Sequence, residues 1–384
     1  MTEQRRPELD TLAVHAGGDP AAADGAVVGP VHRSATYLYP DADRPLRYSR
    51  YGNNPTQVAV QRKLAAIEGA EAALLLASGM AALATAILAV CERGDHLIAA
   101  AGLYGGTRTL LDEELPRLGI ETSYAPGEDP AAWREAARPE TRLFLWESIS
   151  NPLLRVADGP ALAELARELG AVSLVDATFA SPVHQRPISF GADLVMHSAT
   201  KYLGGHSDLV GGVLAGGEER IETARERMKS FGASADPAAA FLLDRGLKTL
   251  PLRMARHDEN GREVADFLAG HPAVAAVHHP SRKDHPDRAV IERVLDGAGG
   301  VVTFVPTTDP VEAERIVGRL RWIRLAPSLG GVESLVSMPA LTSHRSLSSE
   351  ERSRLGIPDE TIRLAVGVEA AEDLIADLDR ALSS

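Results

Sequence analysis

Lys201 and Asp176 each follow a short apolar segment that is typical of a buried strand. Lys201 ends the run Ser198-Ala-Thr-Lys201 after residues 192–196, and Asp176 ends the segment 172–176. A primary amine can form a Schiff base with the aldehyde of pyridoxal 5'-phosphate, and a carboxylate can pair with the nitrogen of its ring. A lysine after a strand is more often a solvated loop residue, so the rest of the chain must decide.

Other segments offer groups that this cofactor would need. Gly79, between a predicted strand and a predicted helix, lets main-chain N–H groups approach a phosphate closely. Tyr104 follows the next strand and could lie against a flat ring, and residues 147–152 place polar groups at the end of another strand. Taken singly, the first segment is better explained as a tight turn and the second as a core tyrosine, and an ordinary turn explains the third equally well.

Two arginines could bind anions. Arg50, with Tyr48 beside it, offers a forked guanidinium and a phenol that suit a phosphate, although a solvated arm is the ordinary alternative. Arg363 stands inside the apolar segment 362–366, where a guanidinium is costly unless an anion meets it. A substrate α-carboxylate would satisfy Arg363 with two parallel hydrogen bonds, and a structural salt bridge to a neighbouring acid is the alternative.

Strands and helices must alternate to position these groups, and the sequence predicts that they do from about residue 56. Predicted strands cover 73–77, 96–100, 143–147, 172–176 and 194–196, and predicted helices cover 58–67, 81–90, 107–118 and 161–169. Short apolar strands that alternate with helices predict an α/β fold with a mainly parallel sheet covered on both faces. Ligands of such sheets bind at the carboxyl ends of the strands.

A second block is expected after a long helix over residues 251–269. Its predicted strands cover 301–305, 323–325 and 362–366, and its helices cover 310–319 and the C-terminal segment, where Leu374, Ile375, Leu378 and Leu382 share one side. The loop 326–331 is a candidate site loop. We expect an extended arm over residues 1–55, a large cofactor-binding domain over 56–250 and a smaller C-terminal α+β domain over 251–384.

The composition restricts the classes of function. The 384 residues carry 40 basic and 53 acidic side chains, and a net charge of −13 disfavours nucleic-acid and anionic-membrane partners and favours a small molecule. A single cysteine, Cys91, excludes an intrachain disulfide and a Cys-based zinc site, and no metal is predicted.

Residues 1–6 are polar with no apolar segment behind them, which predicts a cytoplasmic location. The uncharged stretch 72–91 is long enough to span a bilayer, but Ser78-Gly79 interrupts it, so strand, loop and buried helix are predicted.

Eight segments follow one another in a recognisable order. They are Tyr48-Ser-Arg50, Ser78-Gly-Met80, Tyr104-Gly-Gly-Thr107, Glu147-Ser-Ile-Ser-Asn-Pro152, Asp176-Ala-Thr-Phe179, Ser198-Ala-Thr-Lys-Tyr202, Ser328-Leu-Gly-Gly-Val-Glu-Ser334 and Arg363. In this order they resemble the Cys/Met-metabolism family of pyridoxal-phosphate enzymes. Its members include cystathionine γ-synthase, cystathionine γ-lyase, O-acetylhomoserine sulfhydrylase and methionine γ-lyase. The resemblance runs from about Leu12 to the C-terminus.

The resemblance implies the aspartate-aminotransferase-like fold (type I) and a homotetramer built from two catalytic dimers. It implies that Lys201 binds the cofactor covalently, that Asp176 pairs with the ring nitrogen, and that Tyr104 stacks on the ring and acts as an acid or base. The implied cofactor-binding residues are Tyr48 and Arg50 from the neighbouring subunit, with Ser78, Gly79, Met80, Tyr104, Asp176, Thr178, Ser198, Thr200 and Lys201. The implied substrate-binding residues are Arg363, Ser328 and Asn151 for the α-carboxylate. Glu333 could favour a distal ammonium group, and a solvated loop acid is the alternative.

Four positions depart from the pattern of the family. Arg50 is followed by one residue more than usual before Pro55, which changes the register of the arm. Ala177 replaces the asparagine that is common after the aspartate. Gly106 stands where methionine γ-lyases typically carry a cysteine, which disfavours that activity. Arg345 stands where a small residue usually follows the histidine, which predicts an unusual substrate entrance.

The resemblance implies γ-elimination or γ-replacement on a homoserine-derived or cystathionine-like amino acid. In both reactions the Lys201 amine removes a Cα proton and then a Cβ proton before the γ-substituent leaves. O-Acetylhomoserine sulfhydrylase activity, methionine γ-lyase activity and a specialised-pathway γ-replacement are the alternatives. A non-catalytic amino-acid-binding scaffold is a remote alternative, because Lys201, Asp176 and Tyr104 are all present.

Overall fold

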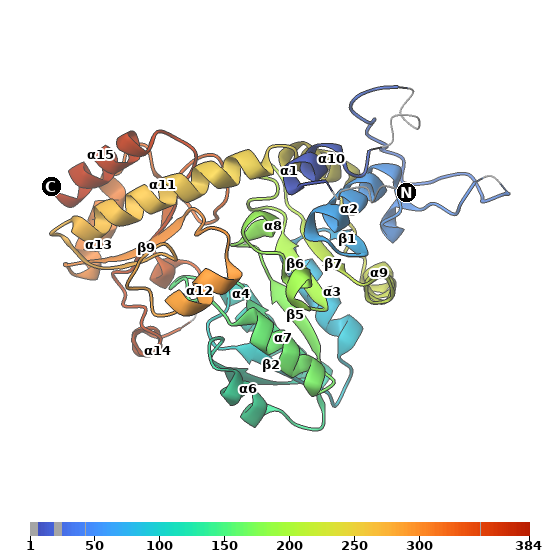
Figure 1. Ribbon diagram of the computed structural model, residues 1–384, viewed down its shortest axis with the longest axis horizontal. Coiled ribbons are helices and arrows are strands. Elements are labelled where there is room, and N and C mark those ends of the chain that lie inside the picture. Colours follow the sequence, from blue (N-terminus) through green and yellow to red (C-terminus); the bar gives the residue numbers. More distant parts are fainter. Residues whose placement is uncertain (1–6, 19–24, 43, 346) are drawn as a thin grey trace.

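Two β-sheets of different size organise the chain. The computed structural model describes residues 7–18, 25–42, 44–345 and 347–384. The larger sheet has seven strands and is built from residues 72–216, and the smaller sheet has five strands and is built from residues 274–365. The long helix α11 (Leu250–Gly270) leads from the first sheet to the second and runs above the second in Figure 1.

The larger sheet is mainly parallel, as predicted. Its strand order is β1-β7-β6-β5-β4-β2-β3. Its strands are β1 (Ala72–Leu76), β2 (His96–Ala100), β3 (Glu121–Ala125), β4 (Thr141–Glu147), β5 (Val172–Asp176), β6 (Leu194–Ser198) and β7 (Gly212–Gly216). Strand β7 runs antiparallel to both of its neighbours, β1 and β6, and the other neighbouring strands are parallel. Because the direction reverses twice, β1 points the same way as β6.

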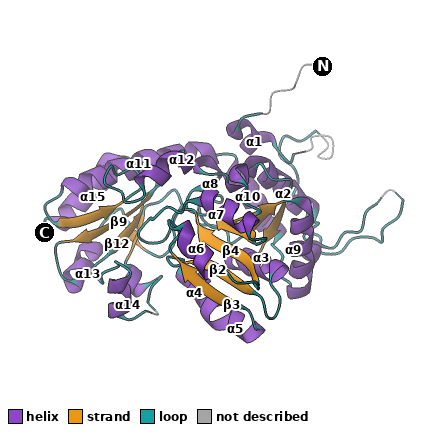
Figure 2. Ribbon diagram, turned by 60° about the horizontal axis from the view of Figure 1, so that its bottom comes forward, coloured by secondary structure: helices purple, strands orange, loops and turns teal. Residues whose placement is uncertain are grey.

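Helices cover both faces of this sheet, as predicted and as Figure 2 shows. They are α2 (Pro55–Glu68), α3 (Gly79–Val90), α4 (Gly105–Thr109), α5 (Leu115–Leu118), α6 (Pro130–Ala136), α7 (Gly159–Glu168), α8 (Ser181–His184), α9 (Glu218–Phe231) and α10 (Pro237–Leu247). In β1, Leu74 and Leu76 join the core that contains α3 and α9, whereas Ala73 and Leu75 join the core that contains α2 and α10. Both faces of the strand are buried, so its apolar run needs no polar alternation.

The helices beside β1 begin at clear sequence signals. At the start of α2, the Asn54 side chain accepts the Thr56 N–H at 2.9 Å, and the Gln57 side chain accepts the Asn54 N–H at 3.2 Å. Ser78 caps α3 by accepting the Ala81 N–H at 3.0 Å. The caps satisfy N–H groups that have no partner within the helix. The cap on α3 therefore fixes the start of this helix directly after β1.

The single helix predicted over residues 107–118 is wrong in detail. A π-helical turn over Leu110–Glu114 separates α4 from α5. Pro116 is the second residue of α5 and has no N–H to donate to the carbonyl four residues earlier, so the regular helical pattern is interrupted at this point.

The smaller sheet carries its own core. Its strand order is β10-β11-β12-β9-β8, with β8 (Val274–His278), β9 (Val301–Pro306), β10 (Arg324–Leu325), β11 (Leu335–Ser337) and β12 (Ile362–Ala365). Its helices are α12 (Arg288–Val294), α13 (Pro310–Arg319), α14 (Ser349–Arg354) and α15 (Ala371–Leu382). Val302 and Phe304 of β9 share a core with Leu374 and Leu378 of α15, which confirms the buried face predicted for the last helix. The boundaries proposed for the domains stay a prediction.

The segment before α2 contains the short helix α1 (Leu9–His15) and long loops. Residues 1–6, whose polarity predicted a cytoplasmic location, lie outside the described residues, as do residues 19–24 of the predicted arm. Val27, Leu38 and Tyr39 are 99%, 72% and 92% exposed, and Figure 1 shows this segment extending away from both sheets. Large exposed apolar side chains of this kind are typical of a surface that contacts another chain.

Residues 72–91 form β1, a turn and α3, as the sequence predicted. Within the part of the chain that the structure describes, we find no helix with the length and apolar character needed to cross a membrane.

Candidate functional site

A cavity of about 1110 Å³ lies at the carboxyl ends of the strands of the larger sheet. Strands β1, β2, β4, β5 and β6 all end at this edge, because β1 points the same way as β6, and β6 is parallel to β5, β4 and β2. Residues 327–329, residues 341–343 and Arg363, all from the second block, line the cavity as well. Chain segments that are distant in sequence therefore meet at the place where α/β sheets bind ligands.

Most of the predicted site residues line this cavity. They are Ser78, Gly79, Met80, Tyr104, Asn151, Asp176, Thr178, Ser198, Thr200, Lys201, Ser328 and Arg363. Tyr48, Arg50 and Glu333 are not among the lining residues. The roles of all these residues stay predictions, and their positions are described below.

Lys201 follows β6, and its side chain reaches the second block. The Lys201 Nζ donates to Ser328 Oγ at 2.7 Å. Burial, helped by the positive charge of Arg363, lowers the pKa of Lys201 from 10.5 to about 8. A measurable fraction of the amine is then neutral near neutral pH, and a neutral amine is the form that attacks a carbonyl carbon.

Arg363 lies on β12 and is bound by two neutral oxygens. One terminal nitrogen donates to Asn151 Oδ1 at 2.8 Å, and the other donates to the Ser328 carbonyl at 3.1 Å. The Nε of this buried guanidinium has no hydrogen-bond partner, and none of the described acids forms an ion pair with it. Burial lowers the pKa of Arg363 to about 10. The geometry favours an anion site over the structural salt bridge, because the cation lacks a counter-ion.

Ser328 joins these two groups. Its hydroxyl accepts the Lys201 amine and its carbonyl accepts the Arg363 guanidinium. Ser328 has a φ of 102°, which is unusual for a residue with a side chain. Such strain concentrates at functional sites, so the loop 326–331 keeps its status as a candidate site loop.

Asp176 ends β5 with its carboxylate at the cavity. Its Oδ1 accepts two hydrogen bonds from Thr178, from the N–H at 3.0 Å and from the hydroxyl at 2.5 Å. The Thr178 Oγ1 in turn accepts the Ser198 N–H at 2.9 Å, which connects the ends of β5 and β6. Burial raises the pKa of Asp176, and the bonds from Thr178 oppose that shift. A cation placed in the cavity would stabilise this carboxylate.

Two glycines let the start of α3 approach the end of β6. A Cβ added to Gly79 would lie 2.8 Å from Ser198 Cβ, and a Cβ added to Gly212 would lie 1.9 Å from the Ser78 carbonyl oxygen. Strand β7 lies between β1 and β6 and begins at Gly212. Because Gly212 has no side chain, Ser78 and Gly79 can lie directly against it. The free N–H groups at the start of α3 thus come close to Ser198, an arrangement that suits a phosphate.

Glu147 is a cavity residue that the sequence analysis included only as the first residue of the segment 147–152, without a role of its own. Its Oε1 accepts the Tyr104 N–H at 2.6 Å, and its Oε2 has no hydrogen-bond partner in the described structure. Glu147 ends β4 just as Asp176 ends β5. This shared pattern, an acid directly after an apolar strand, is the signal that could have identified it.

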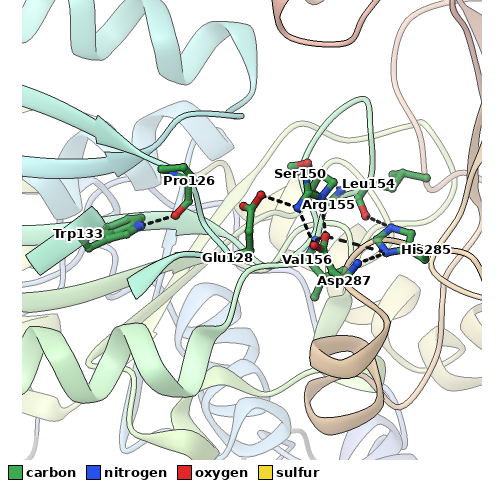
Figure 3. Close-up of polar contacts among 9 residues, drawn as sticks. All are labelled: Pro126, Glu128, Trp133, Ser150, Leu154, Arg155, Val156, His285 and Asp287. Atoms are coloured by element: carbon green, nitrogen blue, oxygen red, sulfur yellow. Dashed lines mark hydrogen bonds and ion pairs between the residues drawn. The ribbon is translucent and has the colours of Figure 1, made fainter. Parts of the chain in front are cut away.

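The loop after β4, which carries Asn151, is tied to the second block. Arg155 donates to Asp287 through Nε and a terminal nitrogen, both at 2.7 Å, and Asp287 also accepts the Val156 N–H at 2.9 Å. The His285 ring lies 3.1 Å from the Leu154 carbonyl oxygen. Figure 3 shows these contacts around Asp287. They hold the loop in place, so the position of Asn151 beside Arg363 depends on both blocks.

Tyr48, Arg50 and Glu333 lie outside the cavity wall of this chain. Arg50 donates to the Lys229 carbonyl, and its guanidinium lies 5.4 Å from the centre of the Tyr48 ring. Glu333 accepts a hydrogen bond from Ser207. One chain alone therefore does not bring these three residues to the cavity.

Two departures from the family pattern lie at the cavity. Gly106 lines it, and a Cβ at this position would lie 2.6 Å from the Tyr104 ring. Arg345 also lines it and is exposed, so a cation stands where a small residue was expected. The sequence analysis pointed to Arg345 but not to residues 341–343, which also line the cavity. No regular pattern of residue types marks these three residues.

The residues present fit pyridoxal phosphate. Asp176 is a carboxylate in need of a cation, as the protonated ring nitrogen would provide. The start of α3 and Ser198 surround a space that a Cβ at Gly79 would obstruct. Lys201 offers an amine whose pKa is already lowered.

A family model described as Cys/Met metabolism PLP-dependent enzyme matches residues 10–383. The chain belongs to this family. The prediction from the eight ordered motifs is thereby confirmed, together with the cofactor, pyridoxal 5'-phosphate. This Cys/Met-metabolism enzyme is a PLP-dependent enzyme of the trans-sulfuration type.

Several curated relatives of this Cys/Met-metabolism enzyme match over nearly their whole length. Cystathionine gamma-synthase from Mycobacterium leprae is 42% identical, and the match covers 98% of this chain and 97% of the relative. Cystathionine beta-lyase from Coxiella burnetii is 40% identical, with 98% of each chain covered. Cystathionine gamma-lyase from Bacillus subtilis is 39% identical, with 97% and 99% covered.

A solved structure confirms the fold of this Cys/Met-metabolism enzyme. Cystathionine gamma-lyase from Lactobacillus plantarum, complexed with L-serine, matches with a TM-score of 0.94 and 37% identity. The match covers 98% of this chain and 99% of that chain. The predicted α/β fold of the type I pyridoxal-phosphate enzymes is therefore correct.

The lowered pKa of Lys201 predicts how cofactor uptake depends on pH. Uptake by the apoenzyme should speed up with rising pH and level off above about pH 8, instead of rising toward 10.5, because the neutral amine is the reactive form. Stopped-flow recording of the visible absorbance of the bound cofactor measures this rate. The Lys201→Ala variant is the control and should show no such absorbance. A rate that keeps rising through pH 10 would contradict the lowered pKa.

Proposed function

We propose that this enzyme catalyses γ-elimination or γ-replacement on a homoserine-derived or cystathionine-like amino acid. The observation that carries the proposal is the shared contact with Ser328, which holds the Lys201 amine at 2.7 Å through its hydroxyl and Arg363 at 3.1 Å through its carbonyl. An amino acid whose carboxylate binds Arg363 would have its α-carbon near the lysine. Such proximity is what proton transfer at Cα requires.

Each side chain has a distinct task in this proposal. The bound cofactor supplies an electron sink for charge that develops on the substrate carbons. Arg363 orients the substrate by its α-carboxylate, with the unpaired Nε as the free donor. The Lys201 amine would remove the Cα proton, give that proton up again so that it is neutral, and then remove the Cβ proton. Ser328 holds the amine between these two transfers.

The cofactor itself would be held from three sides. The N–H groups at the start of α3, with Ser78, Gly79 and Met80, would bind the phosphate, together with Ser198 and Thr200. Asp176 would keep the ring nitrogen protonated, supported by its two bonds from Thr178. Tyr104 lines the same cavity and would cover the ring.

The proposed active site is shared between subunits. Tyr48 and Arg50 do not line the cavity of their own chain, and the arm that carries them displays large exposed apolar side chains such as Tyr39 and Val27. A neighbouring chain could use this arm to bring Arg50 to the phosphate. We therefore propose a homotetramer of catalytic dimers, with an amino acid as the small-molecule substrate. The cytoplasmic location stays a prediction from the sequence.

The alternatives differ in which bond breaks. The cystathionine beta-lyase from Coxiella burnetii is 40% identical, so β-elimination competes with the γ-reactions. Methionine γ-lyase activity is disfavoured, because Gly106 replaces the cysteine typical of those enzymes. A Cβ at position 106 would also come within 2.6 Å of the Tyr104 ring. O-Acetylhomoserine sulfhydrylase activity uses the same residues and stays an alternative.

A panel of substrates tests the proposed reaction. We expect turnover of cystathionine or of an O-acylhomoserine, and 2-oxobutanoate or a thioether as the product, because both arise when a γ-substituent leaves. Chromatographic analysis of the products distinguishes the reactions, with methionine as the comparison substrate. Pyruvate and homocysteine from cystathionine would identify β-elimination and overturn the proposal.

Substitutions at Arg363 and Glu333 separate general from selective recognition. Arg363→Ala should raise KM for every amino-acid substrate, because removal of one partner from a buried charge-assisted pair costs roughly 2 to 5 kcal/mol. Glu333→Ala should weaken only substrates with a distal ammonium group, such as cystathionine, and spare O-acylhomoserines. Steady-state kinetics across the panel measures both effects. An equal loss on all substrates in Glu333→Ala would remove this residue from distal recognition.

Mixing two inactive variants tests the shared site. Arg50→Ala removes the proposed phosphate ligand of one chain, and Lys201→Ala removes the amine of the other. A hybrid dimer regains one complete site, so mixing should restore up to about a quarter of the wild-type activity if chains exchange at random. Each variant alone is the control, and native mass spectrometry of a tagged chain verifies the exchange. No recovery after verified exchange would mean that each site is built from one chain.

A further inference from the structure

Two acidic side chains lie next to each other at the cavity. Glu147 and Asp176 are the last residues of β4 and β5, and they are partners in the register of these parallel strands. In such a pair the side chains point to the same face of the sheet. Glu147 is only 7% exposed, so its carboxyl group is screened from water. Two neighbouring carboxylates in a dry site do not both keep their charge.

The hydrogen bonds decide which of the two is neutral. Asp176 Oδ1 accepts both the N–H and the hydroxyl of Thr178, and these bonds stabilise its charged form. Glu147 Oε1 accepts the Tyr104 N–H at 2.6 Å, whereas its Oε2 has no partner among the described residues. Burial, and secondarily the charge of Asp176, raise the pKa of Glu147 well above its usual value, and the main-chain N–H groups of Tyr104 and Asn151 oppose this shift without cancelling it. A buried O–H without a partner is also less costly than a buried charge without one.

The cations of the main cavity are engaged elsewhere. Lys201 donates to Ser328, and Arg363 donates to Ser328 and Asn151. Arg345 lines the main cavity but is exposed to solvent. Within the described structure, none of these cations forms an ion pair with the Glu147 carboxyl group.

Glu147 also lines a second cavity of about 430 Å³, and the charged groups there do not reach it either. Arg155 is paired with Asp287, and Arg108 is paired with Asp112. Further groups of this cavity are bound too: Arg155 also pairs with Glu128, Arg354 pairs with Glu350, and Glu351 caps α14. Burial lowers the pKa of His344 in its wall to about 4, so this ring is neutral near neutral pH.

We propose that Glu147 is a positioning residue that carries a proton in the resting enzyme. Its Oε1 holds the main chain of Tyr104 in place, and its neutral charge leaves Asp176 as the carboxylate that faces the ring nitrogen of the cofactor. The Oε2 atom that carries this proton is buried and has no hydrogen-bond partner among the described residues. This role depends on the cofactor of the family and is independent of which amino acid is the substrate.

Infrared spectroscopy of the full chain tests the protonation directly. The carbonyl band of a protonated carboxyl group should be present near neutral pH, with and without cofactor. It should disappear in Glu147→Gln and persist in Asp176→Asn. If Glu147→Gln removes no such band, the proposal is overturned, whatever the activity of the variant and whatever the substrate.

Rescue by the isosteric amide tests the positioning role. Glu147→Ala should lower kcat by about 10-fold to 100-fold and weaken cofactor binding, because the Tyr104 N–H loses its acceptor. Glu147→Gln keeps an acceptor oxygen in a neutral group, so it should restore kcat to within about threefold of the wild type and restore its pH profile. Asp176→Asn is the matched control, because there the amide replaces a working charge and should not sustain turnover. A Glu147→Gln enzyme as impaired as Glu147→Ala, or with a shifted pH profile, would mean that the charged form is needed.

Discussion

The buried guanidinium of Arg363 is the interaction on which the rest of the site depends. It stands on a strand of the smaller sheet, yet its two partners, Asn151 and Ser328, come from a loop of the larger sheet and from the loop 326–331. Neutral oxygens alone do not offset the cost of burying a cation, and Nε has no partner at all in the described structure. The fold therefore holds a buried cation without a counter-ion, which is what the proposed binding of a substrate carboxylate requires. The ties of Arg155 to Asp287 keep the Asn151 loop against the second block.

The chemistry of the site follows from exclusion of water at one edge of the larger sheet. Burial makes the Lys201 amine easier to deprotonate and makes Asp176 and Glu147 harder to ionise. These shifts have one cause, and local hydrogen bonds then separate the groups into different roles. Ser328 contacts both the lysine and the arginine, and its backbone has an unusual φ of 102°. Such a conformation costs about 1 to 3 kcal/mol, which the surrounding contacts must offset.

Features that depend on short stretches of sequence, such as apolar strands and the polar residues at their ends, could be predicted. Lys201 and Asp176, which both line the cavity, were predicted as site residues because each lies at or just after the end of an apolar strand, and the alternation of strands and helices was sufficient for the fold class. Strand β7 was missed because Gly212–Gly216 has two glycines and little β-branched character, and β3 was missed because Glu121–Ala125 is polar. Glu147 received no role of its own, although it ends an apolar strand as Asp176 does, because its pairing with Asp176 across β4 and β5 is visible only in the structure.

Strand β7 contributes no side chain to the proposed phosphate site, and yet it sets the dimensions of that site. Gly212 leaves the space in which Ser78 and the start of α3 lie, since a Cβ there would come within 1.9 Å of the Ser78 carbonyl oxygen. The absence of a side chain at position 212 is thus a requirement for the shape of the proposed site. Any larger residue at this position would push the helix start away from Ser198 while the strand pairing on both sides could persist. Selection for cofactor retention would therefore act on a residue that is not part of the cavity wall.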